Sequence, residues 1–166
     1  LTDCTFTGNN ATSAGGAFHE RKSSEEKSPT VTFTNCAFTG NSANEGGAVY
    51  GSTDSSITLA GTTFTENASI GNGGAISIHA ATVNATSGEN RFVCNTAGGN
   101  GAALYISYTS GAEEGVGYDS TVTLTGVVFD DNVAQGNGGE DYERDIWTEM
   151  TPSDPASSTQ IFPKSF

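Results

Sequence analysis

The chain has 166 residues, a formal net charge of −13 and a hydrophobic fraction of 34%. Because Lys and Arg together number 6, no basic patch of the kind that nucleic acids or anionic membranes require is expected. The apolar fraction is low for a globular domain. It suits a narrow solenoid, in which each coil buries few side chains and its neighbours supply the rest.

One pattern recurs five times along the chain: a Phe, an Asn three residues later, and then a Gly-containing pair. The repeated residues are Phe6, Phe38, Phe64, Phe92 and Phe129, with Asn9, Asn41, Asn67, Asn95 and Asn132. The intervals between successive Phe residues are 32, 26, 28 and 37 residues. Self-similarity at a period of about 20–50 residues is the signature of a solenoid.

Short alternating segments surround each copy of the pattern. Residues 31–34, 57–59 and 122–124 alternate apolar side chains with Thr, which predicts strands with one buried face. Residues 76–78 and 104–106 predict a second short strand after the Gly-containing pair. We find no helical periodicity, so the strands are expected to wind into an all-β, parallel β-helix of about five coils. Coils of this kind pair at roughly 4.8 Å.

Each repeated residue has a structural role in such a coil. The Phe side chains are expected to stack in one column along the core, with the Asn side chains beside them. Stacked Asn side chains form a ladder that satisfies buried backbone groups, and Asn also tolerates the left-handed conformation of a turn. Gly suits a bend where φ is positive or where a Cβ atom would clash.

Two insertions and an atypical end interrupt the pattern. Residues 19–28 are charged and residues 109–119 are acidic and Gly-rich, so both are expected to be exposed loops. Residues 140–147 replace the expected apolar segment, and we expect Trp147 and Tyr142 to cover the core there, because terminal solenoid repeats are usually atypical.

The repeats occupy residues 1–147, and residues 148–166 are assigned to an extended C-terminal cap or tail. The chain begins inside a repeat and lacks an initiator Met. It also lacks a recognisable signal peptide or transmembrane stretch. We interpret it as a processed or partial piece of a longer protein.

The three Cys residues fall at two positions of the repeat. Cys4 and Cys36 both lie two residues before a repeat Phe, so they are expected to point inward from adjacent coils. The coil spacing lies within the range of a disulfide, although in-register parallel strands are not ideal for one. A disulfide and a buried thiol ladder therefore both remain open, while Cys94 is expected to be unpaired.

Asn-x-Ser/Thr sequons occur at Asn10, Asn67 and Asn84. Such sequons are acceptors for N-linked glycans in secreted proteins. Asn67 is expected to be buried in the ladder, so the candidate glycosylation sites are Asn10 and Asn84.

No catalytic residue, metal ligand or cofactor site is expected. A pectinolytic β-helix enzyme would need several acidic residues with Arg or Lys on one exposed sheet, and Arg91 is the only base in the fourth coil. Calcium at Asp130–Asp131 with Glu140–Asp141 is an alternative because the oxygen ligands suit Ca²⁺, but no loop there has ligand-type spacing.

The lone residues His19 and His79 are 60 positions apart in the sequence. This separation does not indicate a metal site, and both side chains are interpreted as surface residues.

The pairing of Phe-x-x-Asn with Gly-Gly-Ala-(Ile/Leu/Val) resembles the repeat of the chlamydial polymorphic membrane proteins. Similar repeats occur in surface proteins of algae and protists. The copies span about residues 4–147, most of the chain. The resemblance implies a right-handed parallel β-helix displayed outside the cell, as an adhesin or a structural surface protein, and it implies no catalytic residues.

We therefore expect a non-catalytic extracellular structural or adhesive module of a cell-surface or filament protein. Its expected partners are other protein chains, bound through the coil ends or the tail in a surface assembly, and glycans. One alternative is a carbohydrate-acting, pectinolytic-type enzyme. Another is a glycan-binding module, which would show exposed aromatic residues in a row; Tyr50, Tyr105 and Tyr108 are the candidates, with the orientation of Tyr105 left open.

Overall fold

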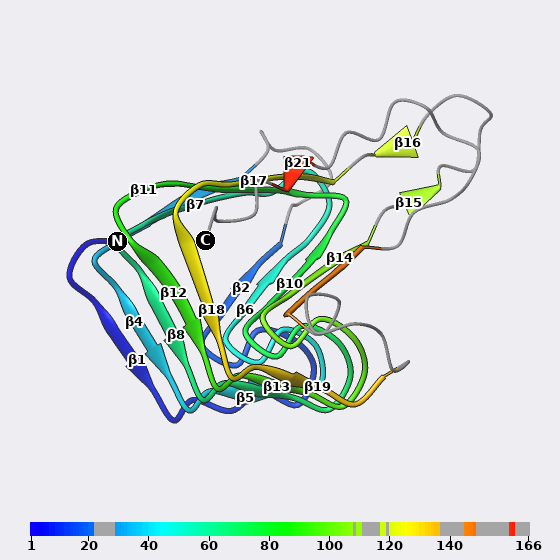
Figure 1. Cartoon of the computed structure of the whole chain (residues 1–166). Coiled ribbons are helices and arrows are strands. Elements are labelled where there is room, and N and C mark those ends of the chain that lie inside the picture. Colours follow the sequence, from blue (N-terminus) through cyan, green and yellow to red (C-terminus); the bar gives the residue numbers. More distant parts are fainter. Residues whose placement is uncertain are drawn as a thin grey trace.

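In the computed structural model, parallel strands stack coil upon coil along one axis (Figure 1). The chain is therefore an all-β parallel solenoid, which confirms the predicted fold class. The structure describes residues 1–21, 29–107, 109–110, 117–118, 120–136, 145–148 and 160–161. Viewed down the axis, the strands form four sides, and each side is a parallel sheet (Figure 1).

The first side, here called the phenylalanine sheet, carries the repeat Phe residues. Its strands, in spatial order, are β1 (Thr5–Thr7), β4 (Ala37–Thr39), β8 (Thr63–Thr65), β12 (Asn90–Val93) and β18 (Val127–Asp130). The register aligns each repeat Phe with the next along the sheet. The differences in sequence interval between successive repeat Phe residues must therefore arise in other parts of each coil.

The second side, the threonine sheet, contains the alternating segments that precede the Phe strands. Its strands are β3 (Thr30–Thr34), β7 (Ser56–Ala60), β11 (Thr82–Ser87), β17 (Thr121–Leu124) and β21 (Gln160–Ile161). In β7 the side chains of Ile57 and Leu59 are fully buried and Thr58 is half-buried. The alternation suits a β-strand, because successive side chains point to opposite faces, one packed in the core and the other exposed to water.

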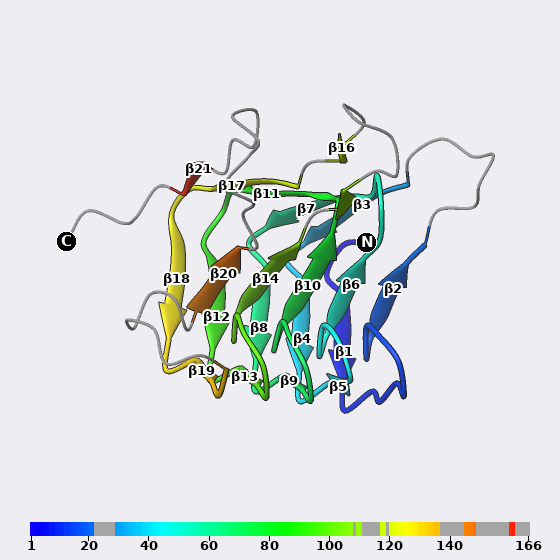
Figure 2. The same cartoon turned by 90° about the vertical axis from the view of Figure 1, so that its right-hand side faces the viewer.

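A short sheet and a longer one complete each coil. The short sheet contains β5 (Ser42–Ala43), β9 (Ala68–Ser69), β13 (Thr96–Ala97) and β19 (Val133–Ala134). The longer one, here called the tyrosine sheet, contains β2 (Phe18–Glu20), β6 (Val49–Gly51), β10 (Ile76–His79), β14 (Leu104–Ser107) and β20 (Ile146–Thr148). Figure 2 looks onto this sheet and shows its strands side by side.

The repeat Phe rings form one stack inside the solenoid. The rings of Phe38, Phe64 and Phe92 are parallel to within 5°, with neighbouring centroids 4.8 Å apart. Phe6 continues the stack at 4.5 Å from Phe38 and Phe129 at 5.4 Å from Phe92. This spacing is set by the rise between paired parallel strands, so the backbone register and the ring stacking support each other.

The Asn residues form a ladder beside the Phe stack. The backbone N–H of Asn41 donates to Asn67 Oδ1 at 3.0 Å, and Asn41 Nδ2 donates to the same oxygen at 2.9 Å. The carboxamide of Asn67 repeats this with Asn95, and its Nδ2 also donates to the carbonyl oxygen of Phe38 at 3.0 Å. Each buried carboxamide thus satisfies backbone groups of the neighbouring coils, as buried polar groups require.

The left-handed turn at this corner lies one residue before the Asn. Gly8, Gly40, Glu66, Cys94 and Asp131 have φ between 51° and 64°, whereas no ladder Asn has a positive φ. The idea that Asn itself adopts the left-handed conformation is therefore wrong. The Asn side chain is needed for hydrogen bonding, and the preceding residue makes the turn.

This corner makes a stability prediction, because only some coils use Gly there. A non-Gly residue in the left-handed region costs about 1–2 kcal/mol, partly offset by the lower chain entropy of its unfolded state. We expect Glu66→Gly to raise the free energy of unfolding by about 1 kcal/mol, measured by urea denaturation.

The matched control for Glu66→Gly is Gly40→Ala at the same corner. A Cβ atom at Gly40 would meet nothing within 4 Å, so any loss reports the backbone conformation alone. We expect a loss of about 1 kcal/mol. Equal stabilities for the two variants would contradict the left-handed corner.

The Gly pair forms a second tight corner, ahead of the tyrosine sheet. Gly46 has a φ of 59°, and a Cβ atom there would overlap the carbonyl oxygen of Val49. Gly47 lies against the next coil, where a Cβ atom would overlap the carbonyl oxygen of Gly74. The first Gly therefore supplies the conformation, and the second permits close approach between coils.

The C-terminal part of the chain continues the sheets beyond the regular repeats. In β20, Ile146 aligns with Leu104 and Trp147 aligns with Tyr105, so the chain is back in the coil register after the atypical sequence that follows Gly139. Residues Gln160–Ile161 pair with β17 as β21, so part of the expected tail lies along the threonine sheet. Tyr142, the other expected cover residue, lies outside the described residues.

Both predicted insertions fall in the sequence between a tyrosine-sheet strand and a threonine-sheet strand. The first was predicted to span residues 19–28, but His19 and Glu20 belong to β2. Residues 22–28 lie outside the described part of the chain. In the second insertion, β15 (Thr109–Ser110) pairs antiparallel with β16 (Gly117–Tyr118) and projects from the coil (Figure 1). This segment was expected to be an exposed loop, and it includes a short β-ladder.

Candidate functional site: a hollow between two tyrosines

The outer face of the tyrosine sheet carries a row of large side chains. The register aligns His19 with Tyr50, Tyr50 with Ser77, and Ser77 with Tyr105. The flanking residues Leu104 and Ile106 belong to the core, so Tyr105 faces outward. Tyr50 and Tyr105 thus flank the small Ser77 side chain along the solenoid axis.

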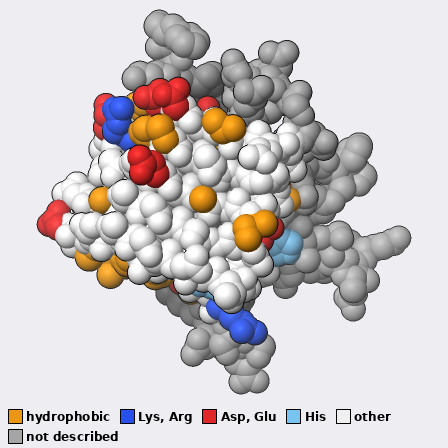
Figure 3. All heavy atoms as spheres, turned by 90° about the horizontal axis from the view of Figure 1, so that it is seen from below, with side chains coloured by type: hydrophobic (Ala, Val, Ile, Leu, Met, Phe, Trp, Pro, Cys, Tyr) orange, Lys and Arg blue, Asp and Glu red, His pale blue; other side chains and the backbone are white. Residues whose placement is uncertain are grey.

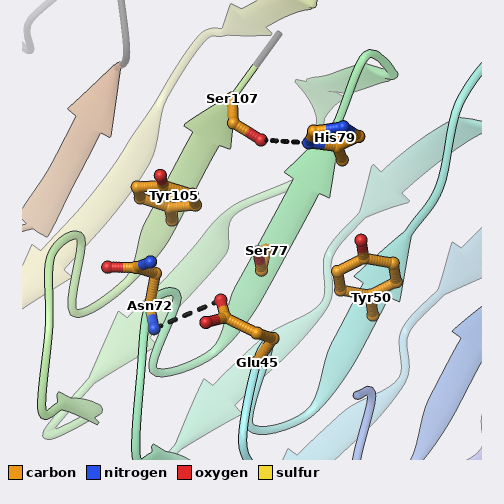
Figure 4. Close-up of a pocket in the computed structure, with 7 residues that line it drawn as sticks. All are labelled: Glu45, Tyr50, Asn72, Ser77, His79, Tyr105 and Ser107. Carbon is orange, nitrogen blue, oxygen red and sulfur yellow. Dashed lines mark hydrogen bonds between the residues drawn. The ribbon is translucent and has the colours of Figure 1, made fainter. Parts of the chain in front are cut away.

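This arrangement leaves a hollow of about 240 Å³ over the serine. Its lining residues come from three coils and are Glu45, Tyr50, Asn72, Ser77, His79, Tyr105 and Ser107. Figure 4 shows the two tyrosine side chains on either side of Ser77, with polar groups at both ends of the strands. Aromatic walls with a few polar groups are the usual composition of a small-molecule site.

The floor of the hollow is the side chain of Ser77. The residue is 3% exposed, and within the described part of the chain its hydroxyl makes no hydrogen bond. A buried hydroxyl normally has a partner. Ser77 therefore offers a hydroxyl to whatever occupies the hollow, water included.

One end of the hollow is closed by the residues that precede the Gly corners. The backbone N–H of Asn72 donates to Glu45 Oε2 at 3.2 Å, and Asn72 Oδ1 accepts a bond from the backbone N–H of Asn100 at 2.8 Å. The first bond holds the Glu45 carboxylate, and the second holds the Asn72 carboxamide. With its oxygen engaged, the remaining Nδ2 group of Asn72 is available as a donor.

The other end of the hollow carries a histidine–serine pair. His79 Nδ1 lies 2.6 Å from Ser107 Oγ (Figure 4). The Ser107 hydroxyl also donates to the carbonyl oxygen of Ile78 at 3.3 Å. On the N-terminal side of the row, the His19 and Tyr50 rings make an edge contact with centroids 5.0 Å apart. The two histidines are thus parts of the tyrosine sheet's outer face.

Burial favours the neutral forms of Tyr50 and His19 on this face. It raises the pKa of the Tyr50 phenol, and the Glu45 carboxylate raises that pKa further. Burial also lowers the pKa of His19, and Arg21 lowers it further. At neutral pH the Tyr50 phenol is therefore a hydrogen-bond donor, and His19 is predominantly an uncharged imidazole.

The hollow presents a single carboxylate among its lining residues, that of Glu45. Glycoside hydrolysis generally uses a pair of carboxylates about 5–10 Å apart. The arrangement suits binding better than two-carboxylate hydrolysis. Among the described residues, no group of three or more His, Cys, Asp or Glu side chains is placed to hold a metal ion.

The acidic residues considered for calcium are only partly described. Asp130 and Asp131 are both exposed at the end of the last phenylalanine-sheet strand. Their proposed companions, residues 140–141, lie outside the described residues. Glu66 is exposed at the left-handed corner of an earlier coil, in a different part of the axis.

The cysteine positions belong to a second internal column. Cys4, Cys36, Thr62 and Asn90 all lie two residues before a repeat Phe. The backbone N–H of Cys36 donates to Thr62 Oγ1 at 3.4 Å, and the backbone N–H of Thr62 donates to Asn90 Oδ1 at 3.0 Å. Sequence reasoning noticed only the two cysteines of this column, although the shared offset from Phe was available to reveal the others.

All three cysteines carry free thiols in this structure. Cys36 is 2% exposed, Cys4 is half-buried, and Cys94 is exposed at the left-handed corner. In the folded chain we expect a thiol reagent to modify Cys94 first and Cys36 last, because exposure limits the reaction. Mass spectrometry of peptides over time measures this order.

The redox state is checked separately by counting thiols under denaturing, non-reducing conditions. Three free thiols per chain are expected. Finding a Cys4–Cys36 disulfide would rule out the buried thiol ladder. Any disulfide that includes Cys94 would contradict the register of the fourth coil.

The two candidate glycosylation sites lie on different sides. Asn10 is exposed, and its Nδ2 donates to Ser42 Oγ at 2.7 Å. Asn84 is half-buried in β11, on the threonine sheet. Asn67 is fully buried in the ladder, so its sequon is inaccessible in the folded chain. Glycans at Asn10 and Asn84 stay predictions.

Three segments of the chain, residues 3–19, 35–52 and 61–79, match the family described as the Chlamydia polymorphic membrane protein repeat. The three matched segments are therefore similar to the polymorphic membrane protein repeat. Each match begins at the corner before a phenylalanine-sheet strand and ends near the end of a tyrosine-sheet strand. No curated protein and no solved structure matches the chain significantly.

The polymorphic membrane protein repeat therefore covers three sides of a coil and leaves out the threonine sheet. The fourth and fifth coils continue the fold outside the matched segments, with Ala102 at the second Gly position and an insertion before Ile146. The repeat and the solenoid together indicate a surface or adhesin-like β-helix module. Among the described residues, the structure contains no helix that is both long and apolar enough to cross a membrane.

Proposed function

We propose that this chain is a non-catalytic, extracellular module that gives a cell-surface or filament protein an adhesive or structural surface. The repeated residues point inward, as the Phe stack and the Asn ladder do. The outward residues differ from coil to coil, as His19, Tyr50 and Ser77 do along one row. A scaffold with a regular interior and a varied exterior suits display of contact residues.

The surface supports contact through particular residues more than through a broad apolar face. Figure 3 looks onto the side that carries the short sheet, and the described surface there is mostly uncharged, with scattered hydrophobic side chains. Ile70 and Val133 are exposed large hydrophobic residues in the described part of the chain. Scattered hydrophobic residues are normal on soluble surfaces, so they do not require a partner.

Adhesion is tested with beads that carry the purified chain. The beads are passed over surfaces coated with mucin or with extracellular-matrix protein, and the fraction retained under flow is measured. Folded chain is expected to hold beads better than heat-denatured chain coupled to the beads at the same density. Equal retention for the two on every surface would contradict an adhesive role.

The absence of catalysis is tested with the same material. Incubation with polygalacturonan is expected to release no reducing ends above background. Turnover that tracks the folded protein would overturn the non-catalytic assignment in favour of the carbohydrate-acting alternative.

We also propose that the ends of the solenoid pair with other protein chains in a surface assembly. The outermost strands of a sheet carry unpaired backbone donors and acceptors, which are a template for a further strand. β1 and β18 hold these positions in the phenylalanine sheet. Sedimentation velocity across a concentration series is expected to show self-association of the 166-residue chain. A soluble monomer at high concentration, with β1 protected from hydrogen exchange, would refute this.

A further inference from the structure

We propose that the hollow over Ser77 binds a neutral oligosaccharide, whose rings lie along the row of tyrosines on the outer face of the tyrosine sheet. This inference deepens the proposed adhesive function and rests on it. The hollow has two aromatic walls, a serine floor and two polar ends, and all of these lie among the described residues.

The walls suit the apolar faces of sugar rings. Tyrosine has a flat apolar body and a polar tip, so it can stack on the C–H face of a pyranose while its phenol bonds a hydroxyl. Tyr50 is half-buried and Tyr105 is 7% exposed, so both rings are held by their surroundings. Holding the side chains in place before binding lowers the entropy lost on binding.

The spacing of the walls suits a linear chain of sugars. Tyr50 and Tyr105 lie two strands apart in register, which is roughly 9.6 Å along the solenoid axis at a strand spacing of about 4.8 Å. This distance is comparable with the length of two linked sugar units in an extended oligosaccharide. The small side chain of Ser77 leaves the space between the tyrosines open, and the hollow of about 240 Å³ is on the scale of one hexose ring.

The polar groups match hydroxyl chemistry. The Ser77 hydroxyl has no hydrogen bond within the described residues, and the Nδ2 group of Asn72 remains available once its oxygen is engaged. The Glu45 carboxylate accepts one backbone bond through Oε2 and lies at the same end. Donors and acceptors that converge on an aromatic-walled hollow favour a ligand with many hydroxyl groups.

A cationic ligand is the main rival for such a site. Aromatic rings and a carboxylate also bind quaternary ammonium groups, and the chain has a formal net charge of −13. However, the tyrosines lie in one row along a sheet face, on either side of Ser77, and do not surround one point as the rings of a cation cage do. Glu45 is in addition engaged by the backbone of Asn72. These features favour the neutral oligosaccharide.

The test is an NMR titration of the whole ¹⁵N-labelled chain with cellotetraose, N-acetylchitotetraose and mannotetraose, and separately with tetramethylammonium. At least one tetrasaccharide is expected to shift the amide signals of Tyr50, Ser77 and Tyr105 together, in a saturable way. Tyr105→Ala is expected to weaken that binding by about tenfold or more. Tyr105→Phe keeps the ring and is expected to retain most of the affinity.

Two controls separate loss of the site from loss of the fold. Thr58→Ala changes an outward residue of the threonine sheet and is expected to leave the affinity unchanged. The amide signals of Asn67 and Asn95 report the ladder, so a variant that keeps them is folded. Their loss in Tyr105→Ala would move the comparison to Tyr50→Ala, which is expected to show the same weakening.

Several outcomes would overturn the proposal. These are no shift in the hollow with any tetrasaccharide, shifts confined to another face, and saturation by tetramethylammonium alone. Adhesion is judged independently, because beads carrying Tyr105→Ala can be tested under flow. If those beads are retained under flow and no tetrasaccharide shifts the amide signals, the oligosaccharide site is refuted and the adhesive function is not.

Discussion

Replacing Phe64 with Ala is expected to lower the free energy of unfolding by about 3–5 kcal/mol. The ring is fully buried and stacks between Phe38 and Phe92, with both centroid distances at 4.8 Å. Its removal forfeits burial of an aromatic side chain and leaves a cavity that the fixed coil spacing cannot close. Because a small domain is stable by only about 5–15 kcal/mol, the loss is expected to be plain in a urea denaturation curve.

The matched control is Phe129→Ala in the last coil of the stack. Phe129 is half-buried and has one stacked neighbour, Phe92, at 5.4 Å. The loss there is expected to be about half as large. Equal losses at Phe64 and Phe129, or a loss below about 1 kcal/mol at Phe64, would contradict the stacked core.

The second large effect is expected from Asn67→Ala. This change leaves the backbone N–H of Asn41 and the carbonyl oxygen of Phe38 without their carboxamide partners in the interior. Each buried unsatisfied polar group costs about 1–3 kcal/mol. We therefore expect a loss of about 2–6 kcal/mol, measured by chemical denaturation with hydrogen exchange at the Asn41 amide.

Asn84→Ala is the control for the asparagine ladder. Asn84 lies on the outer side of the threonine sheet and is half-buried. A change within about 0.5 kcal/mol is expected there. A small effect at Asn67 together with continued protection of the Asn41 amide would show that the backbone of the corner does not depend on the ladder.

The two effects are coupled, because the Phe stack and the Asn ladder share the same strands. Asn67 Nδ2 bonds the carbonyl oxygen of Phe38, whose ring stacks on that of Phe64. Residues in contact usually give non-additive stability changes. The double variant of Phe64 and Asn67 is expected to lose less than the sum of the two single losses.

The sequence by itself determined the fold class and the core positions. A Phe followed three residues later by Asn, repeated through the chain, predicts stacked coils because a solenoid places equivalent residues above one another. The parallel register that aligns Phe38 with Phe64 follows from this repetition. Alternation within the strands, as at Ile57 and Leu59, likewise indicated which face is buried.

Local patterns did not determine how irregular segments return to the coil. The extra residues between Gly139 and Ile146 hid the equivalence of Ile146 and Leu104, because an insertion of any length can precede the same strand position. The left-handed corner was assigned to Asn instead of the residue before it. Asn suits both a turn and a ladder, and only the backbone distinguishes these two uses.

The candidate site depended on tertiary structure for a different reason. Tyr50, Ser77 and Tyr105 come from three coils, and their alignment in one row requires the register between those coils. The sequence identified Tyr50 and Tyr105 as aromatic candidates but gave no reason to place Ser77 between them. The small Ser77 side chain creates the hollow only because its neighbours on the adjacent strands, Tyr50 and Tyr105, are large. These residues are neighbours across the sheet and are far apart in the sequence.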